Sequence, residues 1–523
     1  MEKHEVVVIG GGHNGLIVAA YLAKAGVDVC IIERLDVVGG GVRTEESTLP
    51  GFKHDPFSIE HGLIQSNPII SRDELGLKSK YGLKYLTQDP GYGIIFPDDS
   101  ALFVYHDMDK TCESISQFSE RDAEVFPKFA KACENTSKIL EDFMSSPPPD
   151  FGNMISFMEA SEEGQEYLKL IMESALDVAE DWFESEQMRV ALIRNASEIM
   201  LPPQQKGTGN FVSKFPIAST WASIAEGGSG RLAEVLSACI EDNGGTIKVS
   251  SPVKAVKVEG GEARGVILDS GEEIMATKAV ISGLNVKQLF CELLRPEELP
   301  ATFPDRIKRT RPSVFVGMKQ DIALNEAPKY KAGGDADKAL TLQISPFLED
   351  LLRMFEELAY GIPRVESPLM GVTSLIDPTR APEGKHTLYL YHYEPYDLKD
   401  GGPSRWDEIK EEIADGFLGT LSQHTTNMGP ENILGRFIRT PLDLERYNPA
   451  WIAGDFNHMG IFLSQLFANR PLPGWGHYRT PVSKLYMCGP STHPGPAVSG
   501  GGRAAVQVVM EDLGIDFKKA ISK

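Results

Sequence analysis

A glycine-rich turn between an apolar run and a helical stretch, close to the N-terminus, constrains the fold of this chain more than any other feature. The run Val6–Ile9 has the β-branched composition of a buried strand. Gly10, Gly12 and Gly15 follow it in G-x-G-x-x-G spacing, and a helical stretch covers residues 14–25. This order of strand, glycine turn and helix predicts the first half of a Rossmann unit, which binds a dinucleotide.

Each residue of the turn has a physical role in such a unit. Gly10 allows the tight turn, Gly12 lets the backbone approach a pyrophosphate, and Gly15 lets the helix pack closely on the strand. The helix starts near His13 and Asn14, and its N-terminus presents unpaired N–H groups and a partial positive charge to phosphates. We therefore expect these five residues to contact the cofactor.

A second strand is expected over residues 28–32, after Gly26 ends the helix. It ends at Glu33, 18 positions after Gly15, where a carboxylate can accept hydrogen bonds from ribose hydroxyls. A single G-x-G-x-x-G match is weak evidence, because glycine-rich turns are common. Strand, turn, helix, strand and acid together are specific, and they predict a bound dinucleotide.

The segment after Glu33 distinguishes FAD from NAD, because NAD-binding Rossmann units have no systematic need for a second glycine pair. Gly39-Gly40 and then Arg43-Thr44 follow closely. This extension resembles the second glycine motif of flavoproteins in the amine oxidase and phytoene desaturase superfamily, where glycines and an arginine approach the FAD diphosphate. The resemblance implies cofactor contacts from Arg34, Gly40, Gly41, Arg43 and Thr44. The alternative is a flexible loop with Arg43 as a surface charge.

A further glycine-rich segment near the middle of the chain begins with residues 226–230. A helix is expected over 232–243, followed by strands at 246–249, 253–258, 263–268, 273–276 and 278–282. This order resembles the middle segment of FAD enzymes of the same superfamily, in which the residue matching Val253 lends backbone contacts to the adenine. An ordinary β-meander with no ligand is the alternative.

The C-terminal stretch 485–490 predicts a short strand that runs into a turn, and a glycine-rich loop then opens a helix over 501–513. Such a loop offers N–H groups to an electron-rich partner, here the flavin pyrimidine edge. The string LYMCGPSTHPGPAVSGGGRAA resembles the C-terminal signature of phytoene desaturase-like and carotenoid isomerase-like flavoproteins. It implies cofactor contacts from Gly489, Pro490, Pro496, Ala497 and Val498.

These segments, with GFKHDPFSIEHGL and RPLPGWGHYRTPVSK, are similar to the phytoene desaturase-related FAD oxidoreductases. Within them they resemble the branch called pyridine nucleotide-disulphide oxidoreductase domain-containing protein 2-like. The resemblance implies an α/β fold, in which a discontinuous, GR2-like Rossmann-type FAD-binding domain carries an inserted α+β substrate domain. We expect the FAD-binding domain at 1–75, 221–294 and 476–523, and the substrate domain at 76–220 and 295–475.

The expected substrate domain is partly helical. Amphipathic stretches cover residues 122–144 and 155–178, and the later segment mixes strands with helices. The predicted helix at 346–360 has one broad apolar face, which a packed core helix explains. Two alternatives give this apolar face a function: it lines an apolar substrate tunnel, or it contacts a membrane surface.

Charge and cysteine usage exclude several classes of protein. The net charge of −22 argues against nucleic acid or an anionic membrane as partner, because both would be repelled. The cysteines are scattered without a C-x-x-C pair, which excludes a zinc-knuckle pattern and gives no support to disulphide-reductase chemistry. No metal site is predicted.

The polar start MEKHE runs directly into the first strand, and no apolar run approaches the roughly 18 residues of a membrane span. We therefore expect a cytoplasmic protein with no signal peptide. Peripheral membrane contact and oligomeric state stay open.

No second G-x-G-x-x-G follows a strand, so we expect no separate nicotinamide site. The substrate then reduces the flavin, and oxygen or a quinone removes the electrons. With the family resemblance, this predicts an FAD-dependent oxidoreductase that dehydrogenates, or isomerises, an apolar or aromatic small molecule by hydride transfer to flavin N5. Two rivals stay open: a flavin amine oxidase, and a flavin-binding scaffold with little turnover.

His61 and His458 are the candidate catalytic residues, because an imidazole can act as acid or base near neutral pH. A hydrogen-bonded structural histidine is the alternative for each. Lys319 invites comparison with the lysine that holds a water at flavin N5 in amine oxidases of this superfamily. Further candidates are His54, Asp55, Tyr393, Glu394, Gln465 and His493, of which His493 is expected to brace the flavin loop.

Overall fold

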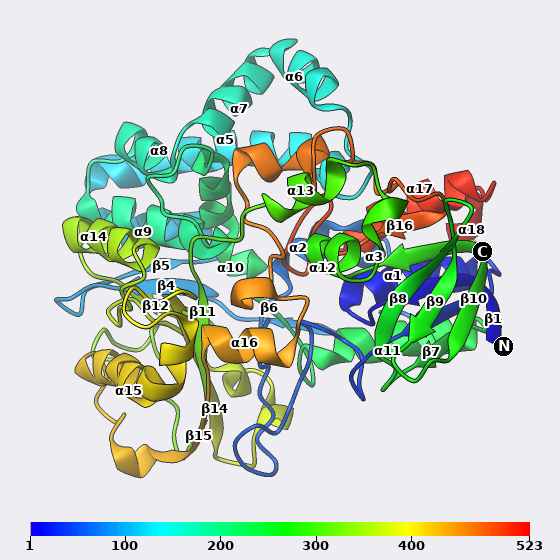
Figure 1. Cartoon of the computed structure of the whole chain (residues 1–523). Coiled ribbons are helices and arrows are strands. Elements are labelled where there is room, and N and C mark those ends of the chain that lie inside the picture. The colour runs from blue at the N-terminus through cyan, green and yellow to red at the C-terminus, as the bar shows by residue number, and fades with distance from the viewer. Residues whose placement is uncertain (1, 523) are drawn as a thin grey trace.

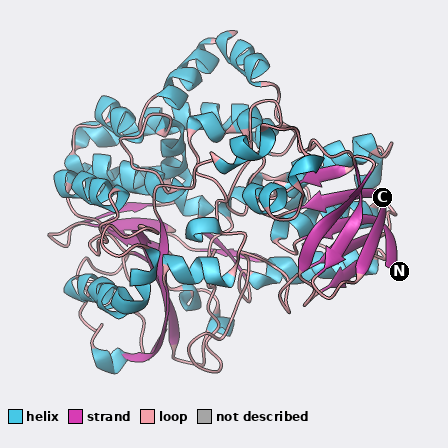
Figure 2. Cartoon of the chain, viewed as in Figure 1, coloured by secondary structure: helices cyan, strands magenta, loops and turns pink. Residues whose placement is uncertain are grey.

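Two mixed sheets organise the chain, of which the computed structural model describes residues 2–522, without the side chains of residues 138–142 (Figure 1). Figure 2 shows the sheets on opposite sides of the molecule, and both chain ends lie beside the first sheet. Helices cover both sheets, which confirms the predicted α/β class.

The first sheet forms around the strand of the glycine motif. Its strands are β1 (Glu2–Ile9), β2 (Val29–Ile32), β7 (Thr246–Lys248), β8 (Val253–Glu259), β9 (Glu262–Leu268), β10 (Glu273–Ser282) and β16 (Leu485–Met487). The order is β7-β2-β1-β10-β9-β8, and β16 also pairs with β10. The pairs of β1 with β2 and β10 are parallel, so segments far apart in sequence meet in one sheet as predicted.

Residues 273–282 differ from the expectation of two separate strands, because β10 is continuous. Its first half pairs antiparallel with β9, for example Ile274 with Val266. On its other edge β10 pairs parallel with β1 along nearly its whole length, from Ile274 with Glu2 to Ser282 with Ile9. One strand therefore closes the hairpin and also returns to the centre of the sheet.

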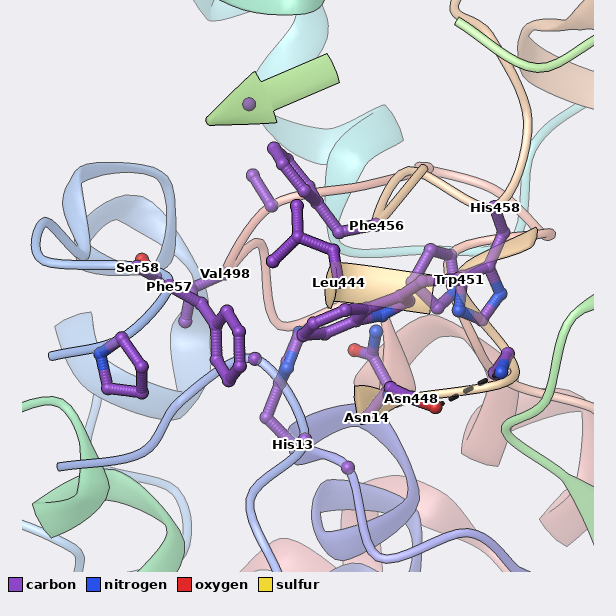
Figure 3. Close-up of a pocket in the computed structure, with 18 of the residues that line it drawn as sticks. His13, Asn14, Phe57, Ser58, Leu444, Asn448, Trp451, Phe456, His458 and Val498 are labelled. Carbon is purple, nitrogen blue, oxygen red and sulfur yellow. Dashed lines mark hydrogen bonds between the residues drawn. The ribbon is translucent and has the colours of Figure 1, made fainter. Parts of the chain in front are cut away.

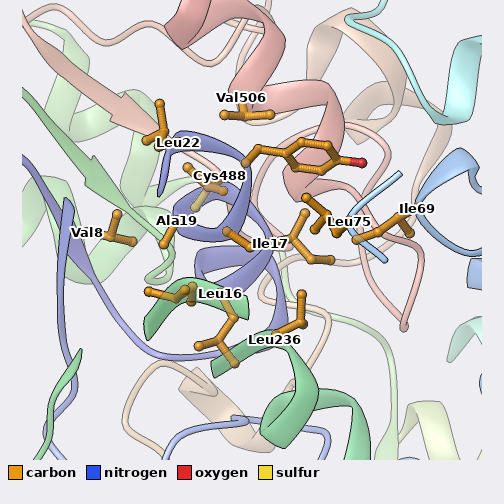
Figure 4. Close-up of a cluster of buried hydrophobic side chains, with 14 of the residues drawn as sticks. Val8, Leu16, Ile17, Ala19, Leu22, Ile69, Leu75, Leu236, Cys488 and Val506 are labelled. Atoms are coloured by element: carbon orange, nitrogen blue, oxygen red, sulfur yellow. The ribbon is translucent and has the colours of Figure 1, made fainter. Parts of the chain in front are cut away.

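Helix α1 (His13–Lys24) lies in the core of this region, and Figure 4 shows the side chains around it. It packs against α11 (Gly230–Asp242) and α17 (Gly502–Asp512). Val8 of β1, Leu236 of α11 and Val506 of α17 all lie in the same buried cluster as its Leu16. Because α1 is held from several sides, its N-terminus is fixed relative to the sheet.

The second sheet carries the residues inserted between the segments of the first. Its order is β15-β11-β14-β13-β12-β4-β5. The strands are β4 (Tyr92–Ile95), β5 (Ala101–Val104), β11 (Val316–Leu324), β12 (Thr341–Ile344), β13 (Leu369–Gly371), β14 (His386–Glu394) and β15 (Ile433–Arg439). A small ribbon of β3 (Tyr85–Thr87) and β6 (Ser223–Ala225) joins the two predicted domains, and the domain boundaries themselves stay a prediction.

Residues 155–178 form parts of three helices where one stretch was expected. These are α6 (Phe151–Glu159), α7 (Glu162–Met172) and α8 (Ala175–Trp182). Ser161 caps α7 by accepting a hydrogen bond from Gly164 N, and Ser174 forms a capping box with Asp177 at α8. Two N-caps inside the stretch start new helices, because a capping serine has extended backbone angles.

The remaining α-helices pack beside one of the two sheets or connect the two halves. They are α2 (Gly62–Ser66), α3 (Pro68–Ser71), α4 (Met108–Ser116), α5 (Glu120–Met144), α9 (Glu186–Ala196), α10 (Ala218–Trp221), α12 (Val286–Cys291), α13 (Phe303–Lys308), α14 (Leu348–Ala359), α15 (Trp406–Gln423), α16 (Pro441–Tyr447) and α18 (Phe517–Ile521). Among residues 2–522, no helix is long and apolar enough to cross a membrane.

Helix α14 is a core helix, as its apolar face predicted. Leu351, Met354, Phe355 and Leu358 are fully buried in a cluster with residues of α8 and α9. The face that would be needed for a substrate tunnel or a membrane contact is therefore occupied by protein.

Glu394 at the end of β14 has no exposed surface, and burial raises its pKa well above that of an ordinary carboxyl group. A carboxyl whose pKa is raised by folding destabilises the protein as pH rises from the unfolded-state pKa toward the folded-state pKa. We therefore expect Glu394→Gln to gain stability relative to the wild type by about 1.4 kcal/mol per pH unit in that range. Urea unfolding at several pH values measures the difference.

Glu383→Gln is the matched control, because Glu383 is exposed. The control should follow the wild-type pH dependence. A Glu394→Gln variant with the same pH dependence as the wild type would show that Glu394 is ionised in the folded protein.

Candidate functional site

A cavity of about 560 Å³ is lined by residues from both sheets. Ile9 and Ile32, the last residues of β1 and β2, border it. Lys319 of β11 and Tyr389 of β14 border it from the second sheet. Ligands of open α/β sheets bind outside the carboxyl ends of the parallel strands, and this cavity has that position.

The glycine turn borders the cavity with the geometry that its spacing predicted. Gly10 has a φ of +94°, which favours glycine. A Cβ on Gly15 would lie 2.3 Å from the Gly10 carbonyl oxygen, so only glycine allows this approach of helix and turn. A Cβ on Gly12 would meet no atom within 4 Å, although Gly12 lines the cavity. Gly12 therefore leaves free the space that a diphosphate needs.

The second glycine segment lies directly beside the first. Gly39 N donates a hydrogen bond to Gly11 O at 2.8 Å, and Gly12 and Gly39 form an isolated parallel bridge. Both segments therefore present backbone to the same part of the cavity. Glu33 is fixed here too, because its Oε2 accepts from Gly11 N at 2.7 Å and its Oε1 from Leu35 N at 2.9 Å.

Most residues of the predicted cofactor site lie around this one cavity. Those that line it are Gly10, Gly12, His13, Asn14, Gly15, Glu33, Arg34, Gly40, Gly41, Val253, Pro490, Ala497 and Val498. Figure 3 shows His13, Asn14 and Val498 among the side chains at the cavity, with Phe57 and Trp451. The fold thus brings all three sequence segments to one place.

Four residues of the predicted cofactor set are not among the residues that line the cavity. Thr44 Oγ1 donates to Asp55 Oδ1 at 2.7 Å and accepts from Gly230 N at 3.0 Å. Arg43 forms an ion pair with Glu45 at 3.0 Å. Gly489 and Pro496 are also absent from the lining. A Cβ on Gly489 would lie 2.3 Å from Gly283 O, so this glycine lets two loops approach each other.

The two candidate catalytic histidines differ in position. His458 lines the cavity, and its Nδ1 lies 3.3 Å from Ser491 Oγ. His61 does not line it, and its Nδ1 lies 3.1 Å from Tyr85 OH. Burial lowers the pKa of each imidazole to about 3, with Arg470 contributing at His458. Both are neutral at physiological pH and therefore weak bases.

The other candidates have structural partners. His493 Nε2 contacts Phe143 O at 2.6 Å, which fits the expected bracing role. Tyr393 OH accepts from Arg194 Nη1 at 2.7 Å. Gln465 accepts a hydrogen bond from Arg311 N with its Oε1 and donates one to Arg311 O with its Nε2. Neither Glu394 nor His54 borders the cavity.

Arg470 holds the C-terminal loop in place, and sequence patterns gave no sign of this role. The buried guanidinium donates to four backbone carbonyls, among them Pro490 O at 2.7 Å and Asn457 O at 2.8 Å. Burial lowers its pKa to about 10. Because Pro490 lines the cavity, Arg470 is a positioning residue for this wall.

Lys319 lines the cavity with its ammonium group already engaged. It donates to Asp55 O, pairs with Asp321 Oδ1 at 2.5 Å and lies 4.1 Å from the centre of the Tyr389 ring. Burial lowers the pKa of Lys319 to about 8. The ammonium is thus held at the cavity wall by protein groups on several sides.

A group of polar side chains lines the cavity on the side of the second sheet, and we call it the polar end. Its members are Glu60, Tyr92, Asn195, Glu198, Lys214, Thr341 and Gln343. Tyr92 OH donates to Gln343 Oε1 at 2.5 Å, and Gln343 Nε2 donates to Glu198 at 2.8 Å. Sequence reasoning missed this group, because its members come from five separate segments without a motif.

Aromatic rings form much of the remaining wall. Tyr389 and Tyr391 stack with ring centres 6.0 Å apart, and Phe57 and Trp451 meet edge to face at 4.6 Å. Asn448 Oδ1 accepts from Ala450 N at 3.1 Å and holds the loop that carries Trp451 (Figure 3).

Comparison with known proteins identifies the family. The model of the "Flavin containing amine oxidoreductase" family matches residues 15–320, which is more than half of the chain. The chain belongs to this family.

Relatives of similar length support this membership. "Pyridine nucleotide-disulfide oxidoreductase domain-containing protein 2" of Rattus norvegicus is 31% identical, over 98% of this chain and 94% of that protein. "Phytoene desaturase (neurosporene-forming)" of Cereibacter sphaeroides is 26% identical, over 95% and 92%. The structure of cyclohexylamine oxidase from Brevibacterium oxydans has the same fold, with a TM-score of 0.59 at 16% identity over 97% and 98%.

The family members are flavin oxidoreductases, and this chain is an FAD-dependent oxidoreductase. The cavity fits the cofactor, because its glycine segments leave open space beside free helix N–H groups. Three buried side-chain atoms at the cavity have no hydrogen-bond partner among the described residues: Asn195 Oδ1 of the polar end, and, outside it, His13 Nε2 and Gln288 Oε1. A bound dinucleotide offers partners to His13 and Gln288, so Gln288 joins the proposed cofactor contacts.

Gly12→Ala tests the cofactor site directly. Its φ of −67° and ψ of 162° suit alanine, and the new methyl group meets no protein atom within 4 Å. We expect an apoprotein of normal stability whose affinity for FAD falls about tenfold or more, because the methyl group occupies the diphosphate space. Reconstitution with FAD, followed by flavin fluorescence, measures the affinity.

Gly419→Ala in α15 is the control, because a Cβ there also meets nothing within 4 Å and Gly419 does not line the cavity. It should bind FAD as the wild type does. Unchanged FAD affinity in Gly12→Ala would place the diphosphate elsewhere.

Proposed function

We propose that this FAD-dependent oxidoreductase dehydrogenates, or isomerises, an apolar or aromatic small molecule at the aromatic wall of the cavity. The observation that carries the proposal is the continuity of one cavity from the glycine segments to Tyr389 and Tyr391. FAD, when bound, accepts a hydride at N5 and passes two electrons to an acceptor. A substrate lying against the tyrosines then shares the cavity with the cofactor.

The residues around the cavity have positioning roles in this proposal. Tyr389 and Tyr391 present aromatic surface to the substrate, and Tyr389 OH is anchored by donating to Phe57 O at 2.9 Å. Burial keeps the His458 imidazole neutral. We propose that this side chain supports the loop at Ser491 and is not protonated. His61 lies outside the lining and has no role in the proposal.

Oxygen or a quinone is the proposed electron acceptor. The sequence contains no second G-x-G-x-x-G after a strand, so it has no recognisable site for a nicotinamide dinucleotide. Dithiol chemistry is also unsupported, because none of the cysteines lines the cavity. Burial raises the pKa of Cys30 and Cys488 to about 12, which leaves their thiols unreactive.

Amine oxidation is the second candidate, and one observation favours it. Stacked Tyr389 and Tyr391 provide an aromatic pair at the cavity, as the amine oxidase alternative requires. Lys319, the lysine of that comparison, lines the cavity and is held there by Asp55 O, Asp321 and the Tyr389 ring, so amine oxidation additionally requires a water at this lysine. Dehydrogenation of a C–H bond does not need such a water.

Anaerobic titration of the holoenzyme tests the proposed function. A polyene or phenol that is a substrate should bleach the flavin absorbance without oxygen, and oxygen or a quinone should restore it. Conversion of a polyene to its isomer without bleaching supports isomerisation instead. Hydrogen peroxide release with amines, but not with polyenes or phenols, would contradict the proposal. Absence of any turnover would leave the scaffold function.

A further inference from the structure

We propose that Lys214, with Glu60 beside it at the polar end, binds a carboxylate group on the substrate. The proposal rests on the proposed function, because it places the substrate in the same cavity. It deepens that function by naming the substrate class, an aromatic or apolar acid.

Lys214 is a cation at the cavity without a protein partner. It lies in the 3-10 helix Gly209–Ile217 and lines the cavity. Among residues 2–522, its ammonium has no hydrogen bond and no ion pair, and burial lowers its pKa. Lys214 is partly buried, and removing part of the water around an ammonium is costly unless an acceptor occupies the space in front of its donors. A ligand oxygen is therefore the partner that this site lacks.

The other charged groups at the polar end and elsewhere on the cavity wall of the second sheet are already matched. Glu198 accepts from Arg194 Nη1 at 2.8 Å and from Gln343 Nε2 at 2.8 Å. Lys319 pairs with Asp321 at 2.5 Å. Lys214 and Glu60 are what is left. They form no ion pair with each other within the described part of the chain.

The protonation state of Glu60 determines the net charge of the polar end. It accepts a hydrogen bond from the Thr341 hydroxyl, and burial raises its pKa to about 7. When Glu60 is protonated, the polar end carries one unmatched positive charge at Lys214. A carboxylate matches that charge and can also accept from the Glu60 hydroxyl. An amine would instead meet a like charge at Lys214.

The rest of the wall fits the body of such an acid. Tyr389, Tyr391, Met200 and Leu369 line the same cavity and offer aromatic and apolar surface. A molecule with an apolar or aromatic body and one carboxylate satisfies both parts of the cavity. A hydrocarbon without a polar group would leave Lys214 unpaired.

The pH dependence of binding follows from the groups that face Glu60. These are Thr341, which donates to Glu60, and the titratable groups whose charges interact with it, namely Glu198, Lys214, Tyr92 and Tyr389. Ionisation of Glu60 adds a negative charge next to the ligand carboxylate. Affinity for the acid should therefore fall as pH rises through about 7. Loss of the Lys214 proton at higher pH acts in the same direction.

Calorimetric titration of the holoenzyme with 4-phenylbutyrate and with the uncharged 4-phenylbutyramide tests the proposal. At pH 6 the wild type should bind the acid about tenfold more tightly than the amide. Lys214→Met should abolish this preference, and Lys214→Arg should retain it. Glu60→Gln should still bind the acid, but without the loss of affinity above pH 7. Lys128→Met is the control, because Lys128 is exposed and distant from the lining.

Equal affinity of the wild type for acid and amide would overturn the proposal, and this comparison needs no variant to fold. Preference for 4-phenylbutylamine that disappears in Glu60→Gln would also overturn it and would assign the polar end to an amine. Calorimetry does not depend on turnover. Acid binding through Lys214 without flavin reduction by any substrate would therefore refute only the proposed function, and flavin reduction without acid preference would refute only this inference.

Discussion

The close approach of helix α1 to its preceding turn is the constraint on which the rest of the site depends. Gly15 lies so near the Gly10 carbonyl that a single methyl group would collide with it at 2.3 Å. This contact, with the buried packing of α1 between α11 and α17, fixes where the helix N-terminus points. The open space at Gly12 and the neighbouring Gly39–Gly40 segment follow from that position. Without this contact between helix and turn, the backbone of the proposed diphosphate site would have no fixed position.

A buried ionic network then joins the second sheet to the segment that follows the second glycine motif. Asp321 pairs with Lys319 and with Arg439, the latter at 2.6 Å, and Asp55 pairs with Arg380 at 2.7 Å. Burial opposes ionisation of Asp321, but the neighbouring cations outweigh it and lower its pKa to about 2. Lys319 also donates to Asp55 O. These contacts hold the aromatic wall at a fixed place relative to the glycine segments.

Local sequence patterns predicted the first sheet well, because its elements are marked by residues with strict physical requirements. Gly10, Gly15 and Gly26 each occupy a position that other residues tolerate poorly, so the boundaries of α1 could be predicted to within one residue. The continuity of β10 as one strand that serves both the hairpin with β9 and the pairing with β1 was missed, because the extent of a strand depends on long-range contacts. The helix breaks at Ser161 and Ser174 were missed, although their capping chemistry was visible in the sequence.

The cofactor part and the polar end of the cavity also differ in how far the sequence predicted their residues. Residues proposed for the cofactor come from three motifs, and most of them line the cavity. Arg43 and Thr44 belong to the same motif but do not line the cavity, and they bond Glu45 and Asp55 respectively, since spacing does not determine side-chain partners. Glu60 and Lys214 lie far apart in the chain and belong to no pattern, so only the fold reveals that they line the same cavity and interact electrostatically. Substrate recognition is therefore the part of the function that requires the structure.

A crystal structure of the holoenzyme tests the central claim, that one cavity holds the cofactor along the glycine segments and the substrate against the tyrosines. The account predicts the FAD diphosphate beside Gly12 and Gly40, with the flavin ring bordering the space in front of Tyr389 and Tyr391. A flavin ring that turns away from these tyrosines, or a diphosphate outside the two glycine segments, would contradict it.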